Sequence, residues 1–297
     1  METSGDAPLS PDLIQVSEDA QTEKALMRLA DGFEIETVLM RHQSGRTTVC
    51  VSSQAGCAYR CAFCATGQAG FNRHLAPTEI VGQVRFFDQR LASEGRRVTN
   101  VVFMGMGEPF HNYDAVVAAL RVLTEDGGMA IARRRVTVST VGLVPEIERF
   151  ATEGLGVNLA VSLHAPNDAL RSRLMPVNER YPLSLLMPIL ADYERHTGRR
   201  VFIEYLMLAG INDRPEHADE LAAWLRGTQH HVNLIPYNQV AGVAWAGSLD
   251  AQVRGFQARL RAAGVPVTVR HPMGRAILAA CGQLQAETQP RGRQPGC

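Results

Sequence analysis

The stretch GCAYRCAFCATG, residues 56–67, contains three closely spaced cysteines, Cys57, Cys61 and Cys64. A [4Fe–4S] cube is held by cysteine thiolates and has four irons to ligate. Three cysteines therefore predict a cluster with one iron free to bind another molecule. The alternative is a structural zinc site, which usually has four Cys or His ligands in paired C-x2-C units. The spacing favours the cluster and leaves zinc open.

Short apolar runs rich in β-branched residues follow the cysteines, and each is bounded by turn residues. Helical patterns separate them, for example over residues 77–95, 181–198 and 216–227. This alternation predicts a parallel sheet, and strands without a polar face predict burial on both sides. We expect an α/β fold, a partial (β/α)6 barrel of the TIM type. The six expected strands lie in residues 100–107, 135–143, 156–164, 201–208, 231–238 and 266–271.

The rest of the chain divides around this core. Residues 1–32 are predicted to be a disordered lead to residue 12 and a short amphipathic helix over 13–30. Residues 33–42 and 46–54 predict a β-hairpin that leads into the cysteines. The core domain is expected to span 33–284, with the hairpin as its N-terminal extension, and 285–297 to be a disordered tail.

The composition excludes several classes of protein. Thirty basic and thirty acidic residues cancel, so no global positive field marks a nucleic-acid binder, and Lys24 is the only lysine. No segment has the roughly 18 uninterrupted apolar residues of a membrane span. The N-terminus lacks the apolar region of a signal peptide. We therefore expect a cytoplasmic protein without a membrane partner, and a monomer.

Unusual residues occur where five of the expected strands end. In (β/α) barrels the active site lies at these carboxyl ends. Each residue alone is more often part of a cap, a tight turn or a satisfied buried polar group, but their repetition at one rim predicts a ligand site. The residues are Gly105, Gly107 and Glu108; Ser139 and Thr140; Ser162, Leu163 and His164; Glu204; and Asn238.

Several ordered blocks between about Glu36 and Leu284 closely resemble the RlmN/Cfr family of radical S-adenosylmethionine (SAM) RNA adenine methyltransferases. The sequences of the blocks FNRHL and NLIPYN are more similar to RlmN than to Cfr. The blocks are CVSSQAGC, CAFCATG, FNRHL, EIVGQV, FMGMGEP, VTVST, GLVP, SLHAP, LMPVN, NLIPYN and AACGQL.

The resemblance implies a reaction and its cofactors. It implies methylation of an adenine ring carbon, carbon 2 in RlmN, in 23S rRNA or tRNA, with a [4Fe–4S] cluster, two SAM molecules per turnover and an electron donor such as flavodoxin. The open iron is then the SAM position. Carbon 8, as in Cfr, and a radical SAM reaction on a substrate other than RNA are the alternatives.

The resemblance also assigns residues. Cys281 matches the cysteine that becomes S-methylcysteine, and Cys50 matches its transient disulfide partner. Glu36 matches the proton acceptor. From the residues alone, each cysteine could equally be a small buried hydrophobe, and Glu36 a solvent-facing strand residue. The implied SAM contacts are Gly107, Glu108, Ser139, Ser162, Leu163, His164 and Asn238.

Two features depart from the family. Only about 30 residues precede the hairpin, where the family usually carries a small helical domain that helps bind RNA. The family's acidic run before the methyl-carrying cysteine is replaced by GRAILAA, residues 274–280. Local arginine groups could hold RNA phosphates, although most such groups are solvated surface. They are Arg96 and Arg97, Arg133–Arg135, Arg171 and Arg173, and Arg199 and Arg200.

Overall fold

The computed structural model describes residues 9–240, 242–270 and 273–284. Ten strands form one sheet in the spatial order β1-β2-β3-β4-β7-β8-β9-β10-β11-β12, while β5 (Gln54–Gly56) and β6 (Phe71–His74) form a separate antiparallel pair. The expected disordered lead, residues 1–12, is described only from residue 9, and its last two residues belong to a strand, β1 (Pro11–Val16), which corrects the expectation there. The expected disordered tail, residues 285–297, lies outside the described residues. In the part of the chain described, no helix is both long and apolar enough to cross a bilayer.

The six expected strands are present, in the expected order. They are β7 (Asn100–Phe103), β8 (Val136–Thr140), β9 (Asn158–Ser162), β10 (Phe202–Met207), β11 (His231–Pro236) and β12 (Val267–Val269). Each pairs in parallel with the next. Because neighbours in the chain are neighbours in the sheet, and the sheet stays open at both ends, the partial (β/α) barrel is confirmed.

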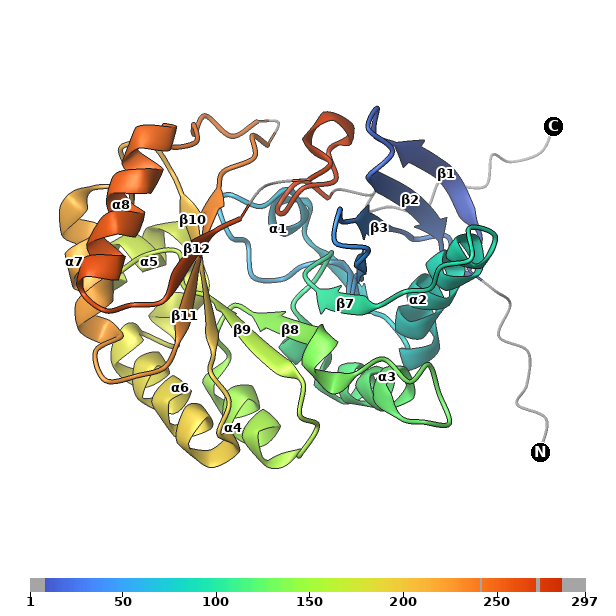
Figure 1. Cartoon of the computed structure of the whole chain (residues 1–297), viewed down its shortest axis with the longest axis horizontal. Coiled ribbons are helices and arrows are strands. Elements are labelled where there is room, and N and C mark those ends of the chain that lie inside the picture. The colour runs from blue at the N-terminus through green and yellow to red at the C-terminus, as the bar shows by residue number, and fades with distance from the viewer. Residues whose placement is uncertain (1–8, 241, 271–272, 285–297) are drawn as a thin grey trace.

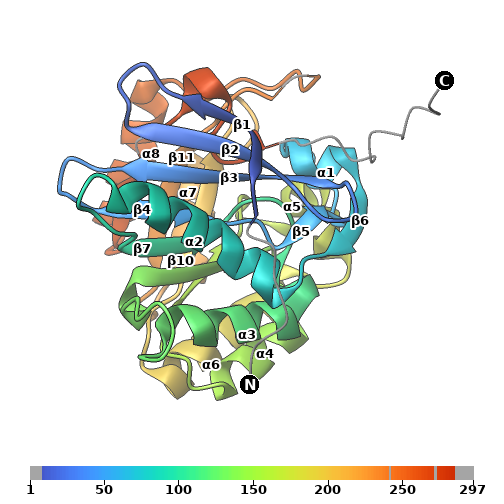
Figure 2. The same cartoon turned by 90° about the vertical axis from the view of Figure 1, so that its right-hand side faces the viewer.

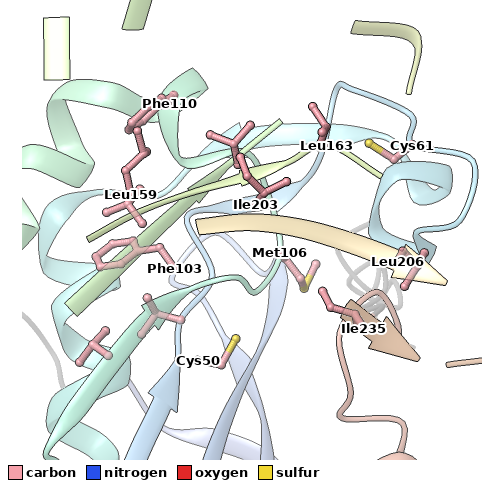
Figure 3. Packing of buried hydrophobic residues seen from close by; sticks show 14 of the residues in the cluster. Cys50, Cys61, Phe103, Met106, Phe110, Leu159, Leu163, Ile203, Leu206 and Ile235 are labelled. Carbon is pink, nitrogen blue, oxygen red and sulfur yellow. The ribbon is translucent and has the colours of Figure 1, made fainter. Parts of the chain in front are cut away.

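Helices lie around the outside of the parallel strands (Figure 1). The main ones are α2 (Pro77–Ala92), α3 (Tyr113–Thr124), α4 (Val144–Thr152), α5 (Asp168–Leu174), α6 (Leu183–Thr197), α7 (Pro215–Trp224) and α8 (Asp250–Ala262). α2 shows why they pack there: Ile80, Val84, Phe87 and Leu91 share one buried stripe at helical spacing. Apolar side chains from helices and strands fill the interior (Figure 3).

The predicted hairpin is also present. β3 (Glu34–Arg41) pairs antiparallel with β4 (Thr47–Cys50). The structure adds that β4 pairs in parallel with β7, so the parallel part of the sheet contains seven strands rather than six. The hairpin is thus continuous with the barrel.

The helix expected over residues 13–30 is wrong. β1 (Pro11–Val16) and β2 (Thr22–Arg28) occupy this segment and extend the sheet beyond β3 (Figure 2). A tight turn joins them, in which Ser17 N–H donates to Thr22 O and Ala20 has a φ of +53°. β2 lies between two strands and is mostly buried, so tertiary pairing overrides the helical pattern of this segment.

Candidate active site

A cavity opens at the carboxyl ends of the parallel strands, and we call it the rim cavity. Its empty space is about 910 Å³, a volume that includes the open solvent at its mouth. The ends of β7–β11, the cysteine loop and the C-terminal segment all contribute to its wall. The predicted residues that line it are Cys57, Cys61, Cys64, Gly105, Gly107, Glu108, Ser139, Thr140, Ser162, His164, Glu204 and Cys281.

Backbone contacts hold the cysteine loop in place. Cys57 N–H donates to Gly70 O at 2.7 Å, and Ala62 N–H donates to Leu174 O at 2.9 Å. Gly56 has a φ of +80°, and a Cβ there would lie 2.0 Å from Gly70 O. Only glycine fits this position, because both the backbone angle and the space exclude a side chain. The first cluster cysteine therefore follows a fixed turn.

Gly107 and Glu108 follow β7 in the chain and form part of the cavity wall. Glu108 is buried, and its Oε1 and Oε2 accept hydrogen bonds from Phe110 N–H (2.9 Å) and Val141 N–H (2.8 Å). Burial raises the pKa of Glu108 to about 7. A carboxylate kept in such a site is suited to a cationic ligand, because an ammonium group offsets the cost of burying the charge.

The end of β9 carries a histidine in an unusual backbone conformation. His164 has a φ of +58°, and its Nδ1 accepts from Leu206 N–H at 3.1 Å. Burial lowers its pKa to about 3, so the ring is neutral. Its neighbour Leu163 is fully buried and outside the cavity wall, but its N–H donates to Glu204 O at 3.1 Å.

The C-terminal segment, residues 273–284, is anchored beside the cavity. Asn238 Nδ2 donates to Cys281 O at 3.4 Å, and Arg275 Nε donates to Asn238 Oδ1 at 2.6 Å. Asn238 does not line the cavity wall; it holds this segment instead. Ala65 N–H donates to Gly282 O at 2.9 Å, so Cys281 lies beside the cysteine loop. The Cys281 side chain itself is exposed.

Cys50 and Glu36 lie outside the cavity wall, on one face of the sheet. Cys50 pairs with Val38, two residues beyond Glu36 on β3, so the two side chains share a face. Cys50 is packed among apolar residues (Figure 3). Burial, and next the Cys281 thiol, raise the pKa of Cys50 to about 12. The two cysteines are thus close enough to interact.

Glu36 is neither in the cavity wall nor facing solvent, which excludes the solvent-facing alternative. Its side chain is 7% exposed, and Oε1 lies 2.8 Å from Lys24 Nζ. Its backbone N–H donates to Met106 Sδ at 3.3 Å. The carboxylate is therefore a buried, ion-paired group.

Known proteins resemble the chain over nearly its whole length. The Radical SAM superfamily matches residues 51–222. A Parafrankia sp. (strain EAN1pec) protein, described as a probable dual-specificity RNA methyltransferase RlmN, is 51% identical over 297 residues, covering 96% of this chain and 77% of that protein. The dual-specificity RNA methyltransferase RlmN 1 of Myxococcus xanthus (strain DK1622) is 48% identical, covering 94% and 77%.

A solved structure agrees with them. The crystal structure of a radical SAM methyltransferase from Sphaerobacter thermophilus superposes with a TM-score of 0.92 at 50% identity, covering 94% of this chain and 81% of that one. The chain belongs to the RlmN family of radical SAM methyltransferases. The family expected from the sequence is confirmed, and membership implies SAM and an iron–sulfur cluster as cofactors.

The donor set fits the cluster that the RlmN family implies. Among the described residues, no three His, Cys, Asp or Glu side chains are arranged to hold one metal ion. Cys57, Cys61 and Cys64 are free thiols on one loop of the cavity wall. Burial raises the pKa of Cys57 to about 12, whereas a bound metal deprotonates its thiol ligands. Three such donors suit a cluster with one open position.

Some residues of this RlmN-family site were missed from the sequence. Arg270, just after β12, donates from Nη2 to Glu204 Oε1 at 2.9 Å, and Glu204 lines the cavity. Glu204 Oε2 is buried without a partner in the described residues. Only five of the six strand ends were used to predict the site. Arg270 follows the sixth strand, β12, and a charged residue at that position could have indicated that it belongs to the site. Lys24 stands out in the sequence only as the single lysine, and its pairing with Glu36 is visible only in the structure.

One of the candidate arginines does not fit a role in RNA binding. Arg171 is fully buried, and its guanidinium donates to Asn178 Oδ1 and Val141 O. Because it has no exposed surface, it does not offer a contact to an RNA phosphate. Arg199 is similarly occupied by Val157 O and Asn158 Oδ1. Arg173 remains exposed.

Proposed function

We propose that this enzyme methylates carbon 2 of an adenine in RNA, with Cys281 as the methyl carrier. The observation that carries the proposal is the placement of two cysteines that are not cluster ligands. Cys281 is exposed beside the cysteine loop, and Cys50 is buried within its electrostatic reach. A simple methyl transfer from SAM would need neither thiol.

The chemistry of the target explains the need for a carrier. Carbon 2 lies between two ring nitrogens and is electron-poor, so it does not attack the methyl group of SAM. The Cys281 thiolate does, because thiolates are strong nucleophiles. The S–CH3 bond forms and S-adenosylhomocysteine leaves. When bound, the cluster and a second SAM supply reductive SAM cleavage, and hence a radical that removes one hydrogen atom from this methyl group.

Two further residues complete the reaction. The methylene radical on Cys281 adds to carbon 2 and joins enzyme to RNA. Glu36 accepts the ring proton, and the ring radical gives up one electron, for which the cluster, when bound, would be the acceptor. The Cys50 thiolate then attacks the Cys281 sulfur, so that a disulfide forms, the carbon–sulfur bond breaks, and the methylene carbon takes up a proton to give the methylated base. An external reductant, for which flavodoxin is a candidate, must restore both thiols before the next turnover.

SAM is proposed to occupy the rim cavity. Gly107 and Glu108 would contact the ammonium group of SAM. Ser139, Ser162 and His164 would line the rest of its binding site. Leu163 and Asn238 would act indirectly, through their hydrogen bonds to Glu204 O and Cys281 O. Two SAM molecules are consumed for each methyl group transferred. The RNA substrates are proposed to be 23S rRNA and tRNA, in line with the dual specificity in the relatives' names.

Anaerobic reconstitution tests the proposal. The cluster-loaded enzyme, SAM and a reductant are incubated with 23S rRNA or tRNA, and nucleosides are identified by mass spectrometry. We expect 2-methyladenosine. 8-methyladenosine would replace the proposal with Cfr-type chemistry, and SAM cleavage with unmodified RNA would indicate a different substrate.

The cysteine roles are tested separately. Cys50→Ala should leave RNA covalently attached to the protein on a denaturing gel, because nothing releases the base from Cys281. Cys281→Ala is the matched control and should give neither adduct nor S-methylcysteine. Free product at the normal yield from Cys50→Ala would overturn the assignment.

A further inference from the structure

Lys24 is the only lysine among 297 residues, and the other 29 basic residues are arginines. It is buried on β2, and its Nζ lies 2.8 Å from Glu36 Oε1, with side-chain exposures of 10% and 7%. A buried ion pair is weak evidence for stability, because desolvation offsets its attraction. Stability alone therefore does not explain a buried lysine beside Glu36.

The sheet register connects this pair to Cys50. Val38 on β3 pairs with Lys24 on one side and with Cys50 on the other. Paired residues share a face, so the three side chains form one row across β2, β3 and β4. Glu36 lies two residues from Val38 on the same face of β3 and pairs with Leu26, so the ion pair is diagonal. Lys24, Glu36 and Cys50 therefore share one face of one rigid sheet.

We infer that Lys24 is a positioning residue, which holds the Glu36 carboxylate in place to accept the proton from the RNA-bound intermediate. The inference rests on the proposed function. In this step the ring C–H bond breaks, the proton moves to the carboxylate, and the ring radical gives up one electron, for which the cluster, when bound, would be the acceptor. Lys24 touches neither the base nor the cofactor and acts only through Glu36.

The chemistry of lysine fits this role better than that of arginine. An ammonium is a compact point charge, whereas a guanidinium is a broad fork that favours planar, bidentate partners. A single short contact to one carboxylate oxygen, such as the one at 2.8 Å, suits the ammonium.

The neighbouring pair on the same strands provides a control. Arg28 and Glu34 are directly paired on β2 and β3, and Arg28 Nη2 lies 3.1 Å from Glu34 Oε1. This ion pair lies on the same face of the sheet. Glu34 is two residues from Glu36 along β3, on the side away from Val38 and Cys50. A loss of function that came only from weakening these strands should follow either substitution.

The test separates the steps of one turnover. Lys24→Met and Arg28→Met holoenzymes are followed for S-methylation of Cys281, SAM cleavage and release of RNA from the covalent adduct. We expect Lys24→Met to release RNA at least tenfold more slowly while the first two steps stay within twofold. Lys24→Arg should fall between it and the natural enzyme, and Arg28→Met should release RNA normally. Equal slowing of all three steps by Lys24→Met, or normal release, would overturn the inference.

A double-mutant cycle keeps the test decisive if Lys24→Met folds poorly. Lys24→Met with Glu36→Gln removes both buried charges, and its RNA release is compared with Glu36→Gln alone. If Lys24 acts through Glu36, the two rates agree within twofold; a further tenfold loss shows an independent effect and rejects the inference. If Glu36→Gln itself releases RNA normally, the proposed role of Glu36 fails instead.

Discussion

Gly107 shows how strictly single positions shape the rim cavity. It has a φ of +100°, and a Cβ there would lie 2.5 Å from Gln54 Cβ. The same Gln54 receives the Glu108 N–H at 2.8 Å. A side chain at residue 107 must therefore displace the residue that orients Glu108. The glycine is required by backbone angle and by space together.

Gly107→Ala should destabilise the protein by about 2–4 kcal/mol, because backbone strain and a close contact add. Gly95→Ala is the control: its φ is also positive, at +66°, but nothing lies within 4 Å of the added Cβ. It should cost only about 1 kcal/mol. Chemical denaturation of both variants measures the difference. Equal losses would show that the contact with Gln54 contributes nothing.

The neutral ring of His164 predicts a pH dependence of stability. Burial lowers its folded-state pKa to about 3, whereas the unfolded chain takes up the proton near pH 6.5. The unfolded state therefore binds more protons below that pH, and stability is lost as pH falls. Between pH 7.5 and 5.5 this residue should account for about 1 kcal/mol.

His164→Asn isolates this contribution. Asparagine tolerates a positive φ and can accept the Leu206 N–H in place of Nδ1. The free energy of unfolding of the cluster-free protein, measured at both pH values, should fall less in the variant than in the natural protein. The same loss in both proteins would contradict the prediction.

At the scale of elements, Arg171 joins parts of the chain that sequence alone could not connect. It lies on α5, and its guanidinium binds Val141 O after β8 and Tyr181 O before α6. Burial lowers its pKa to about 10. One buried cation therefore satisfies carbonyl groups from several loops beside the cavity.

Arg171→Met should destabilise the protein by about 2–4 kcal/mol, because it leaves buried carbonyls without donors. Arg173→Met, on the exposed side of the same helix, should stay within about 0.5 kcal/mol. Thermal unfolding checks both. If both variants melt like the natural protein, the burial of Arg171 has no energetic role.

These elements show what the sequence could predict and why. The strands β7–β12 were readable because buried parallel strands are continuously apolar, and the cysteine loop because its spacing is local. β1 and β2 were missed because their strand state comes from pairing with β3. Lys24 beside Glu36 and the burial of Arg171 depend on register and on distant carbonyls, which no local pattern contains.

At the scale of the whole molecule, both parts of the proposed chemistry are fixed to one sheet. β3 and β4 carry Glu36 and Cys50 at one side, and β7–β11 form the wall of the rim cavity. β4 belongs to both, since it pairs with β3 and with β7. The C-terminal segment, the red loop near α1 in Figure 1, returns from the far end of the chain, and the bond from Ala65 N–H to Gly282 O brings Cys281 beside the cysteine loop.

The docking of that segment can be tested at one hydrogen bond. Thr66 Oγ1, on α1 (Ala65–Ala69), donates to Leu284 O at 2.6 Å, and both residues are buried. Thr66→Val keeps the shape and removes the donor, which should weaken docking by about 1 kcal/mol. Cys281 would then spend less time near Cys50.

We expect the Cys50–Cys281 disulfide to form roughly fivefold more slowly in Thr66→Val, since 1 kcal/mol corresponds to about that factor. The cluster-free protein is treated with diamide, and the linked peptides are quantified over time by mass spectrometry. Thr124→Val is the matched control, because Thr124 Oγ1 donates to Leu120 O within α3, away from the site. If all three proteins form the disulfide at one rate, the segment approaches Cys50 without the Thr66 contact, and the contacts of Asn238 and Gly282 suffice to dock it.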